Sequence, residues 1–132
     1  MLDNESFLAT ARANAFAIYN GITVRQLELG KAEAQLTVGD NHRNPRGKLH
    51  GGAYYTLSDC AAGAACRTDG RKYVTLDGMI HFIRAAEHGV VIASAEVIHR
   101  GRTTSLVQIE IKGEDGTLYA MGDFTFFCIS GS

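Results

Sequence analysis

Features that stabilise a chain by covalent or metal cross-links are scarce in this sequence. Its 132 residues include one proline and three cysteines, and no two of the cysteines have the spacing of metal ligands. An odd number of cysteines without a paired pattern favours a reducing compartment, so we expect a cytoplasmic protein. A chain of this length buries about two-thirds of its unfolded surface and needs no disulfide or metal to fold.

Long apolar runs and an excess of one charge are missing as well. No apolar stretch reaches the ~20 residues that cross a bilayer. The N-terminal segment carries Asp3, Glu5 and Arg12, which is not the pattern of a signal peptide. The formal net charge is -1, with acidic and basic residues scattered along the chain. This balance argues against nucleic acid or an anionic membrane as the main partner.

No linker, repeat or low-complexity segment divides the chain, so we expect a single domain over residues 1–132. Helical spacing of apolar residues predicts a first helix between Asp3 and Gly21. A second, main helix is predicted over residues 51–70. Alternating apolar and polar residues predict six strands, at 22–30, 31–39, 72–84, 90–99, 103–113 and 118–130.

This order of elements predicts an α+β fold. The turns RGRT and GEDGT are short enough for hairpins, so the sheet should be largely antiparallel. The later strands are long, about ten residues each, and one long helix is available to cover them. Small residues along that helix would let a curved sheet wrap closely around it. They form one stripe with a single leucine: Ala53, Leu57, Cys60, Ala61 and Ala64.

The stretch NPRGKLHGGAYYTLSD, from Asn44 to Asp59, holds the candidate chemistry. Gly51 and Gly52 open the main helix, where backbone N–H groups lack intrahelical acceptors and carry positive partial charge. Such groups suit an oxyanion forming on a carbonyl, and His50 can donate a hydrogen bond beside them. Asp59 lies two turns further, away from the small-residue stripe, and can act as a general base or a nucleophile. A tight turn and a solvated aspartate explain each feature alone, so only the combination favours a site.

In this combination the chain resembles the hotdog-fold acyl-CoA thioesterases, in particular the phenylacetic-acid-degradation (PaaI-like) branch. That family has an asparagine six residues before the histidine of H-G-G and an acid nine residues after it. Asn44, His50 and Asp59 stand at these spacings here. The segments VTLDGMIHFIRAA, IHRGRTT and DGTLYAMGDFTFF match the later strands of the family, so the resemblance covers nearly the whole chain after residue 20.

The resemblance implies a hotdog fold and hydrolysis of an acyl- or aryl-acyl-CoA thioester to the free acid and CoA. The Gly51 N–H would polarise the thioester carbonyl, and His50 and Asn44 would orient or polarise it. Asp59 would be the catalytic carboxylate, reaching across from a partner subunit. Thr75 matches a serine or threonine that helps to hold the attacking water. The implied assembly is a homodimer, commonly paired into a homotetramer.

The same resemblance implies no metal or redox cofactor, because coenzyme A arrives as part of the substrate. Gly52 belongs to the glycine pair that lets a ligand approach closely, and we assign it to substrate binding. Arg100 and Arg102 lie in a turn and can bind the phosphates of coenzyme A. A solvated hairpin tip explains these two arginines equally well.

Two rival functions remain open. A non-catalytic acyl-CoA or acyl-ligand binding protein on the same fold would bind without turnover, although Asp59 and the helix start favour the enzyme. A hotdog hydratase or dehydratase usually pairs an acid with a histidine a few residues later. Asp40 lies too far before His50 for this, and Asn44 occupies the nearer position.

The other histidines and the cysteines are expected to be structural or exposed. His42 and His88 fall in predicted loops and should be exposed, and His81 and His99 fall on strands. The histidines show no metal-ligand spacing, and the cysteines lack a paired base.

The acyl group is left open by the sequence. Tyr54, Tyr55 and Phe82 can line an aryl pocket, but core packing is the favoured interpretation. The predicted first helix carries an apolar stripe, which we expect either to pack in the core or to form a wall of the acyl pocket. Its residues are Phe7, Leu8, Ala11, Ala15 and Ile18.

Overall fold

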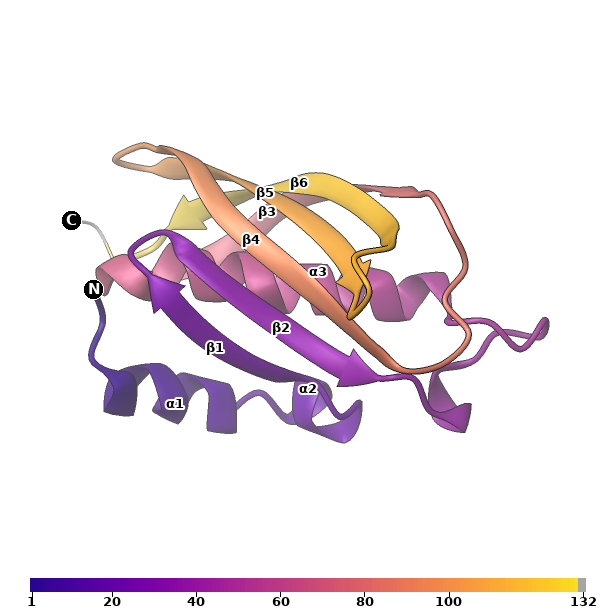
Figure 1. The fold of residues 1–132 in the computed structure, drawn as a ribbon. Helices are drawn as coiled ribbons and strands as arrows, with labels where there is room; N and C mark the ends of the chain where they lie inside the picture. Colours follow the sequence, from indigo (N-terminus) through magenta and orange to yellow (C-terminus); the bar gives the residue numbers. More distant parts are fainter. Residues whose placement is uncertain (131–132) are drawn as a thin grey trace.

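A six-stranded antiparallel sheet curves around one long helix, which confirms the predicted α+β class (Figure 1). The computed structural model describes residues 1–130. The strands lie in the order β1-β2-β4-β5-β6-β3, and every neighbouring pair is antiparallel. Their bounds are β1 Thr23–Glu28, β2 Lys31–Thr37, β3 Tyr73–Phe82, β4 Val90–Arg100, β5 Thr104–Gly113 and β6 Leu118–Cys128. The helices are α1 Asn4–Arg12, α2 Ala15–Tyr19 and α3 Gly51–Cys66, with short 3-10 turns η1 Asp40–His42 and η2 Arg67–Asp69.

The N-terminal helix is broken in two, so the prediction of one continuous helix was wrong. The break follows from Asn14, whose side chain accepts a hydrogen bond from Ala17 N at 3.1 Å and caps α2. Asparagine side chains compete with the helical backbone in this way and favour caps over helix interiors. The predicted start and end are confirmed: Asp3 caps α1, and Gly21 adopts a left-handed φ of 70° after α2.

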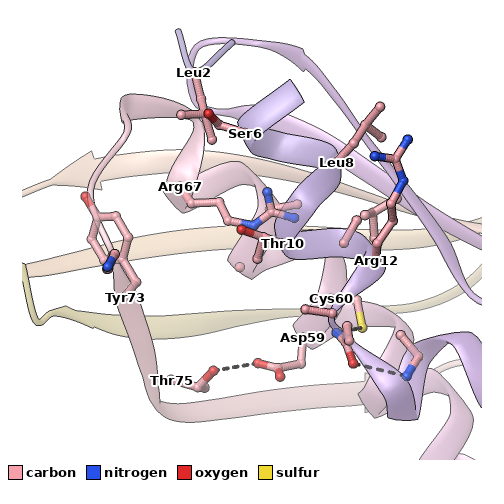
Figure 2. Close-up of a pocket in the computed structure, with 18 of the residues that line it drawn as sticks. Leu2, Ser6, Leu8, Thr10, Arg12, Asp59, Cys60, Arg67, Tyr73 and Thr75 are labelled. Atoms are coloured by element: carbon pink, nitrogen blue, oxygen red, sulfur yellow. Dashed lines mark hydrogen bonds between the residues drawn. The ribbon is translucent and has the colours of Figure 1, made fainter. Parts of the chain in front are cut away.

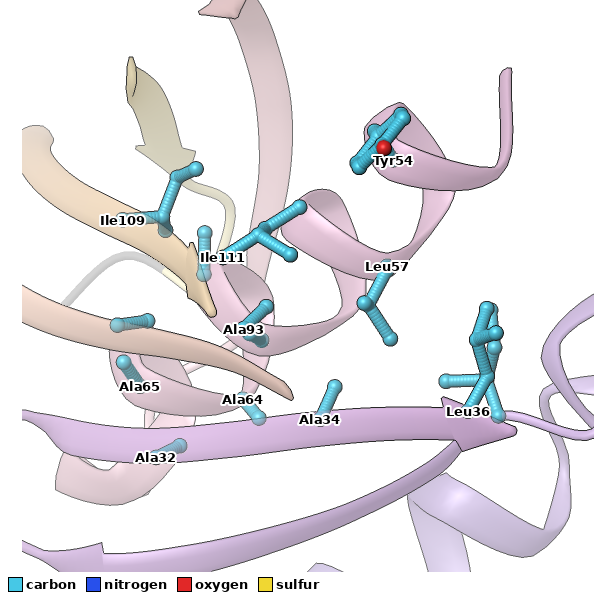
Figure 3. Packing of buried hydrophobic residues seen from close by; sticks show 14 of the residues in the cluster. Ala32, Ala34, Leu36, Tyr54, Leu57, Ala64, Ala65, Ala93, Ile109 and Ile111 are labelled. Carbon is cyan, nitrogen blue, oxygen red and sulfur yellow. The ribbon is translucent and has the colours of Figure 1, made fainter. Parts of the chain in front are cut away.

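The core lies between α3 and the concave side of the sheet (Figure 3). Leu57, Ala61 and Ala64 of the predicted stripe are fully or almost fully buried. They face small residues of the sheet, including Ala34 and Ala93. Small side chains on both surfaces allow the helix and the sheet to approach closely, which fits a sheet that wraps around its helix.

Strand β3 is an exposed and largely apolar edge of the sheet. It pairs with β6 on one side, and its other side has no strand among residues 1–130. Val74, Leu76, Met79 and Phe82 are each 44–60% exposed. Long, unprotected apolar edges are unusual in monomers because they present unpaired backbone groups to other chains. This edge therefore has the properties of an interface.

Gly78 is required in β3 by close packing. A Cβ atom at this position would overlap the ring of Phe124 and lie 2.8 Å from Tyr55 Oη. Gly78→Ala should therefore lower the free energy of unfolding by about 1–3 kcal/mol, as overpacking does in other cores. Urea unfolding tests this against Ser94→Ala at an exposed position of β4. Equal stabilities of the two variants would contradict the packing argument.

Candidate active site

The carboxylate of Asp59 is held by a hydrogen bond between α3 and β3. Thr75 Oγ1 donates to Asp59 Oδ1 at 2.7 Å (Figure 2). Asp59 is half-buried, and no other hydrogen bond or ion pair to its side chain occurs among residues 1–130. The threonine thus orients the carboxylate, while Oδ2 stays available to accept a proton or to contact a ligand. The structure brings these two predicted site residues together in one chain.

The start of α3 presents a backbone N–H group without an acceptor. His50 is the N-cap; its Nδ1 accepts from Gly52 N at 2.8 Å, and its carbonyl accepts from Ala53 N at 2.9 Å. No hydrogen bond from the Gly51 N–H occurs among the described residues. Because Nδ1 accepts a hydrogen bond, the neutral His50 ring carries its proton on Nε2. This end of the helix therefore offers a free backbone donor next to a histidine donor.

Asn44 shapes the loop that leads to His50. Its Oδ1 accepts hydrogen bonds from Arg46 N at 2.9 Å and Lys48 N at 3.1 Å. Its backbone N–H donates to Lys48 O at 2.7 Å, which closes the turn. These contacts use the side-chain oxygen for the loop, so only the Asn44 amide NH₂ stays available to a substrate.

His42 is buried, so the prediction that it is exposed was wrong. Only 7% of the residue is accessible. Its Nδ1 accepts from Gly39 N at 3.0 Å, and its Nε2 donates to Asn20 O at 2.8 Å. The carbonyl of His42 accepts from His50 N at 2.8 Å. His42 thus ties the end of α2 to the cap of α3, through contacts that loop composition did not indicate.

The two arginines predicted to bind phosphate have different surroundings. The Arg100 guanidinium donates to Asp69 Oδ2 at 2.8 Å, to Tyr73 Oη at 2.9 Å and to Cys66 O at 3.0 Å. These contacts favour a structural role at the C-terminus of α3, where a cation is stabilised by the helix dipole. Arg102 is exposed at the β4–β5 turn, so binding of a CoA phosphate stays a prediction for its side chain.

The contribution of Asp69 to the free energy of unfolding should depend on pH, and the contacts of its carboxylate determine the direction. Burial acts to raise the pKa of Asp69, but hydrogen bonds from Tyr73 and Arg71 outweigh it and lower this pKa. The charge of Arg100 lowers the pKa further. A pKa below that of the unfolded chain contributes stability above about pH 4, and this contribution is lost as the pH falls through the folded-state pKa.

Asp69→Asn should therefore lower the free energy of unfolding by about 1–3 kcal/mol near pH 7 and make its decline in acid shallower. Urea unfolding at pH values on both sides of about 4 measures both effects. Asp123→Asn changes an exposed carboxylate on β6 and should keep the wild-type decline. If the free energy of unfolding falls as steeply in acid for Asp69→Asn as for the wild type, Asp69 is not the source of this pH dependence.

A groove of about 1100 Å³ runs between α1 and β3, with α3 as its floor (Figure 2). Asp59 and Thr75 lie in its lining, so the carboxylate faces this space. The groove falls near the upper end of the size range of small-molecule sites. Leu8, Ala11 and Ile18 of the N-terminal stripe line it too, whereas Phe7 is buried in the core.

The aromatic residues considered for an aryl pocket do not line this groove. Tyr54 is 3% exposed, donates to Arg84 O at 3.1 Å and accepts from Ala86 N at 3.0 Å, as expected of a core tyrosine. Tyr55 packs against Phe124 with ring centroids 5.2 Å apart. Core packing is thus confirmed for Tyr54, whereas Tyr55 and Phe82 are 40% and 58% exposed, and Phe82 contacts the Tyr54 ring at a centroid distance of 5.7 Å.

Cys60 and Cys66 are poor nucleophiles in this fold. Burial raises the pKa of Cys60 to about 11 and that of Cys66 to about 12. Neither thiol is therefore ionised near neutral pH. Among residues 1–130, no three histidine, cysteine or acidic side chains gather as metal ligands would. Within the same residues, no helix is long and apolar enough to cross a membrane.

One chain cannot bring both halves of the candidate site to the same atom. Gly51 and Asp59 lie on one helix, about 12 Å apart along its axis at 1.5 Å per residue. A carbonyl that accepts a hydrogen bond and is attacked by an activated water needs both groups within about 3–3.5 Å of the reacting atoms. The geometry of a single chain is that of two separate half-sites.

Residues 46–120 match the family model of the thioesterase superfamily. The chain belongs to this superfamily. It is 34% identical over 108 residues to a 1,4-dihydroxy-2-naphthoyl-CoA hydrolase of Listeria monocytogenes, covering 80% of this chain and 88% of the relative. It is 30% identical over 117 residues to the acyl-coenzyme A thioesterase PaaI of Escherichia coli, covering 82% and 84%.

Solved structures of this superfamily confirm the hotdog fold. The E. coli PaaI protein aligns with a TM-score of 0.91 and 27% identity, covering 97% of this chain and 94% of that one. The resemblance drawn from the histidine–glycine–glycine motif and the later strands is therefore confirmed at the level of family and fold. The two curated relatives named above are thioester hydrolases by name.

Proposed function

We propose that this protein hydrolyses acyl-CoA thioesters to a carboxylic acid and free coenzyme A. The observation that carries the proposal is the Asp59 carboxylate, oriented by Thr75 in the wall of a groove. The free N–H of Gly51 and the membership in the thioesterase superfamily support it. A carboxylate and an oxyanion donor are the two groups that thioester hydrolysis requires.

The proposed active form is a homodimer, which the incomplete site of one chain requires. Antiparallel pairing of two β3 edges would satisfy their free backbone groups and cover exposed apolar side chains such as Leu76 and Met79. A two-fold arrangement of this kind places two copies of α3 side by side in opposite directions. Asp59 of one subunit can then lie opposite Gly51 of the other. Two such dimers could pair into a tetramer.

In the proposed reaction, the Gly51 N–H and the start of α3 stabilise negative charge on the thioester carbonyl oxygen. The Nε2–H of His50 is positioned to donate a second hydrogen bond. Asp59 takes a proton from water, the water oxygen bonds to the carbonyl carbon, and the C–S bond breaks. The thiolate of coenzyme A leaves with the electron pair and takes up a proton. Direct attack by Asp59 would use the same groups through an anhydride intermediate.

A panel of acyl-CoA substrates tests the proposal. Purified protein should release free thiol from at least one of phenylacetyl, benzoyl, short aliphatic and long aliphatic acyl-CoA. The competing interpretation, a non-catalytic acyl-CoA binding protein, predicts binding by calorimetry without thiol release. Tight binding of several members of the panel with no turnover would overturn the proposed hydrolysis.

A further inference from the structure

The floor of the groove connects Asp59 with an arginine at the far end of α3. Asp59, Gly63 and Arg67 follow one another at four-residue intervals, so they lie on one face of the helical segment, and all three line the groove. Asp59 and Arg67 are separated by about 12 Å along the helix axis. Gly63 has no side chain between them, and the ring of Phe126, which also lines the groove, borders this position at 3.6 Å from where a Cβ would lie. Asp59 and Arg67 are therefore joined by a stretch of groove lining in which the helix contributes no side chain at Gly63.

Arg67 is a partly buried cation without a carboxylate partner. Its guanidinium carbon lies 4.0 Å from the centroid of the Phe7 ring, and Nη1 reaches Phe7 O at 3.5 Å, the limit of a hydrogen bond. No acidic side chain forms an ion pair with it among residues 1–130, whereas Arg71 and Arg100 both pair with Asp69. Burial lowers the pKa of Arg67, which reports the loss of water around this charge.

The charges around the groove favour an anionic ligand at this end. Figure 2 shows the Arg67 side chain extending from the end of α3 toward α1, inside the groove. Arg12 and Lys72 add positive charge to the lining, and Asp59 is the one acidic residue among the described residues that line it. An unpaired guanidinium in partly dehydrated surroundings presents donors that match a carboxylate in a bidentate geometry.

We infer that Arg67 binds an oxygen anion at the distal end of the acyl group, so that the site prefers acyl-CoA substrates whose acyl chain ends in a carboxylate. This rests on the proposed thioester hydrolysis at Asp59. The separation of about 12 Å between the two residues along the helix accommodates a medium-length acyl chain. The phosphates of coenzyme A are a poorer match, because the extended pantetheine arm holds them farther from the thioester than this distance.

Matched pairs of substrates test the inference: octanoyl-CoA with suberyl-CoA, and hexanoyl-CoA with adipyl-CoA. In the wild type, kcat/KM should be about 10 to 100 times higher for the carboxylated substrate than for its unsubstituted partner. Arg67→Met keeps an apolar stem over Phe7 and should bring the ratio close to one. Arg25→Met removes an exposed charge on β1 and should keep the wild-type ratio.

The outcomes separate this inference from the proposed function. No thiol release from any acyl-CoA by the wild type would overturn both. Turnover with no preference for the carboxylated substrates, or an Arg67→Met variant with the wild-type ratio, would overturn the inference alone. In Arg67→Met, kcat/KM could fall by the same factor for every substrate, and free coenzyme A could inhibit more weakly by that factor. This result would mean that Arg67 binds a phosphate of coenzyme A instead. Thermal unfolding of Arg67→Met, together with its residual turnover of octanoyl-CoA, shows whether the variant is folded.

Discussion

Asp59→Asn is expected to lower kcat for thioester hydrolysis by about 10³-fold. The substitution keeps the size of the side chain and an oxygen that can accept the Thr75 hydrogen bond, but it removes the negative charge. Both a general base and a nucleophile need that charge, so the loss is expected for either role. Thiol release under saturating substrate measures kcat directly.

The fold of the variant should be intact because Asp59 is half-buried and forms no ion pair among the residues that the structure describes. Asp123→Asn provides a matched control, since it makes the same chemical change at an exposed position of β6. An Asp59→Asn protein that hydrolyses its best substrate within tenfold of the Asp123→Asn rate would be incompatible with a catalytic role for this carboxylate.

Gly51→Pro is expected to lower kcat by about 10²- to 10³-fold, because it removes the one backbone donor assigned to the oxyanion. Proline is favoured at the first residue of a helix, where its missing N–H costs no intrahelical hydrogen bond. The residue before a proline must be extended, and His50 already has φ -64° and ψ 141°. The substitution therefore removes a single N–H group at little expected cost to the fold.

Gly51→Ala is the control for added volume at this position. A Cβ there would lie 3.6 Å from the ring of Phe82, which is ordinary van der Waals contact, and the N–H is retained. Alanine should therefore keep most of the activity, and proline should not. Equal rates for the two variants would show that the Gly51 N–H does not stabilise the transition state.

The fold and the local parts of the site were predictable because their signals are periodic or close in sequence. Alternation of apolar residues identified the strands, and small residues at helical spacing identified the face of α3 that the sheet covers. The glycine pair after His50 predicted a helix start with free N–H groups, and α3 begins at Gly51. Such patterns depend only on neighbours along the chain.

Most of the structural features that the sequence analysis missed depend on contacts between residues far apart in sequence, which local patterns do not record. The break at Asn14 is the local exception: its side chain caps α2 three residues on, but the apolar spacing around it matches one continuous helix. His42 is buried because it meets the end of α2. Arg100 is the last residue of β4 and contacts Asp69 in the 3-10 turn η2 after α3, although the sequence analysis placed it in a turn. The groove under α1 and the unpaired charge of Arg67 likewise emerge only from the folded chain.

Mixed dimers test whether, as proposed, each active site combines Asp59 of one subunit with Gly51 of another. Asp59→Asn and Gly51→Pro proteins should each be nearly inactive alone. When the two are co-expressed or refolded together in equal amounts, about half of the dimers are mixed, and each mixed dimer contains one intact site. Thiol release should then recover to about a quarter of the wild-type rate per subunit. Activity that stays at the sum of the two separate variants would contradict a shared site.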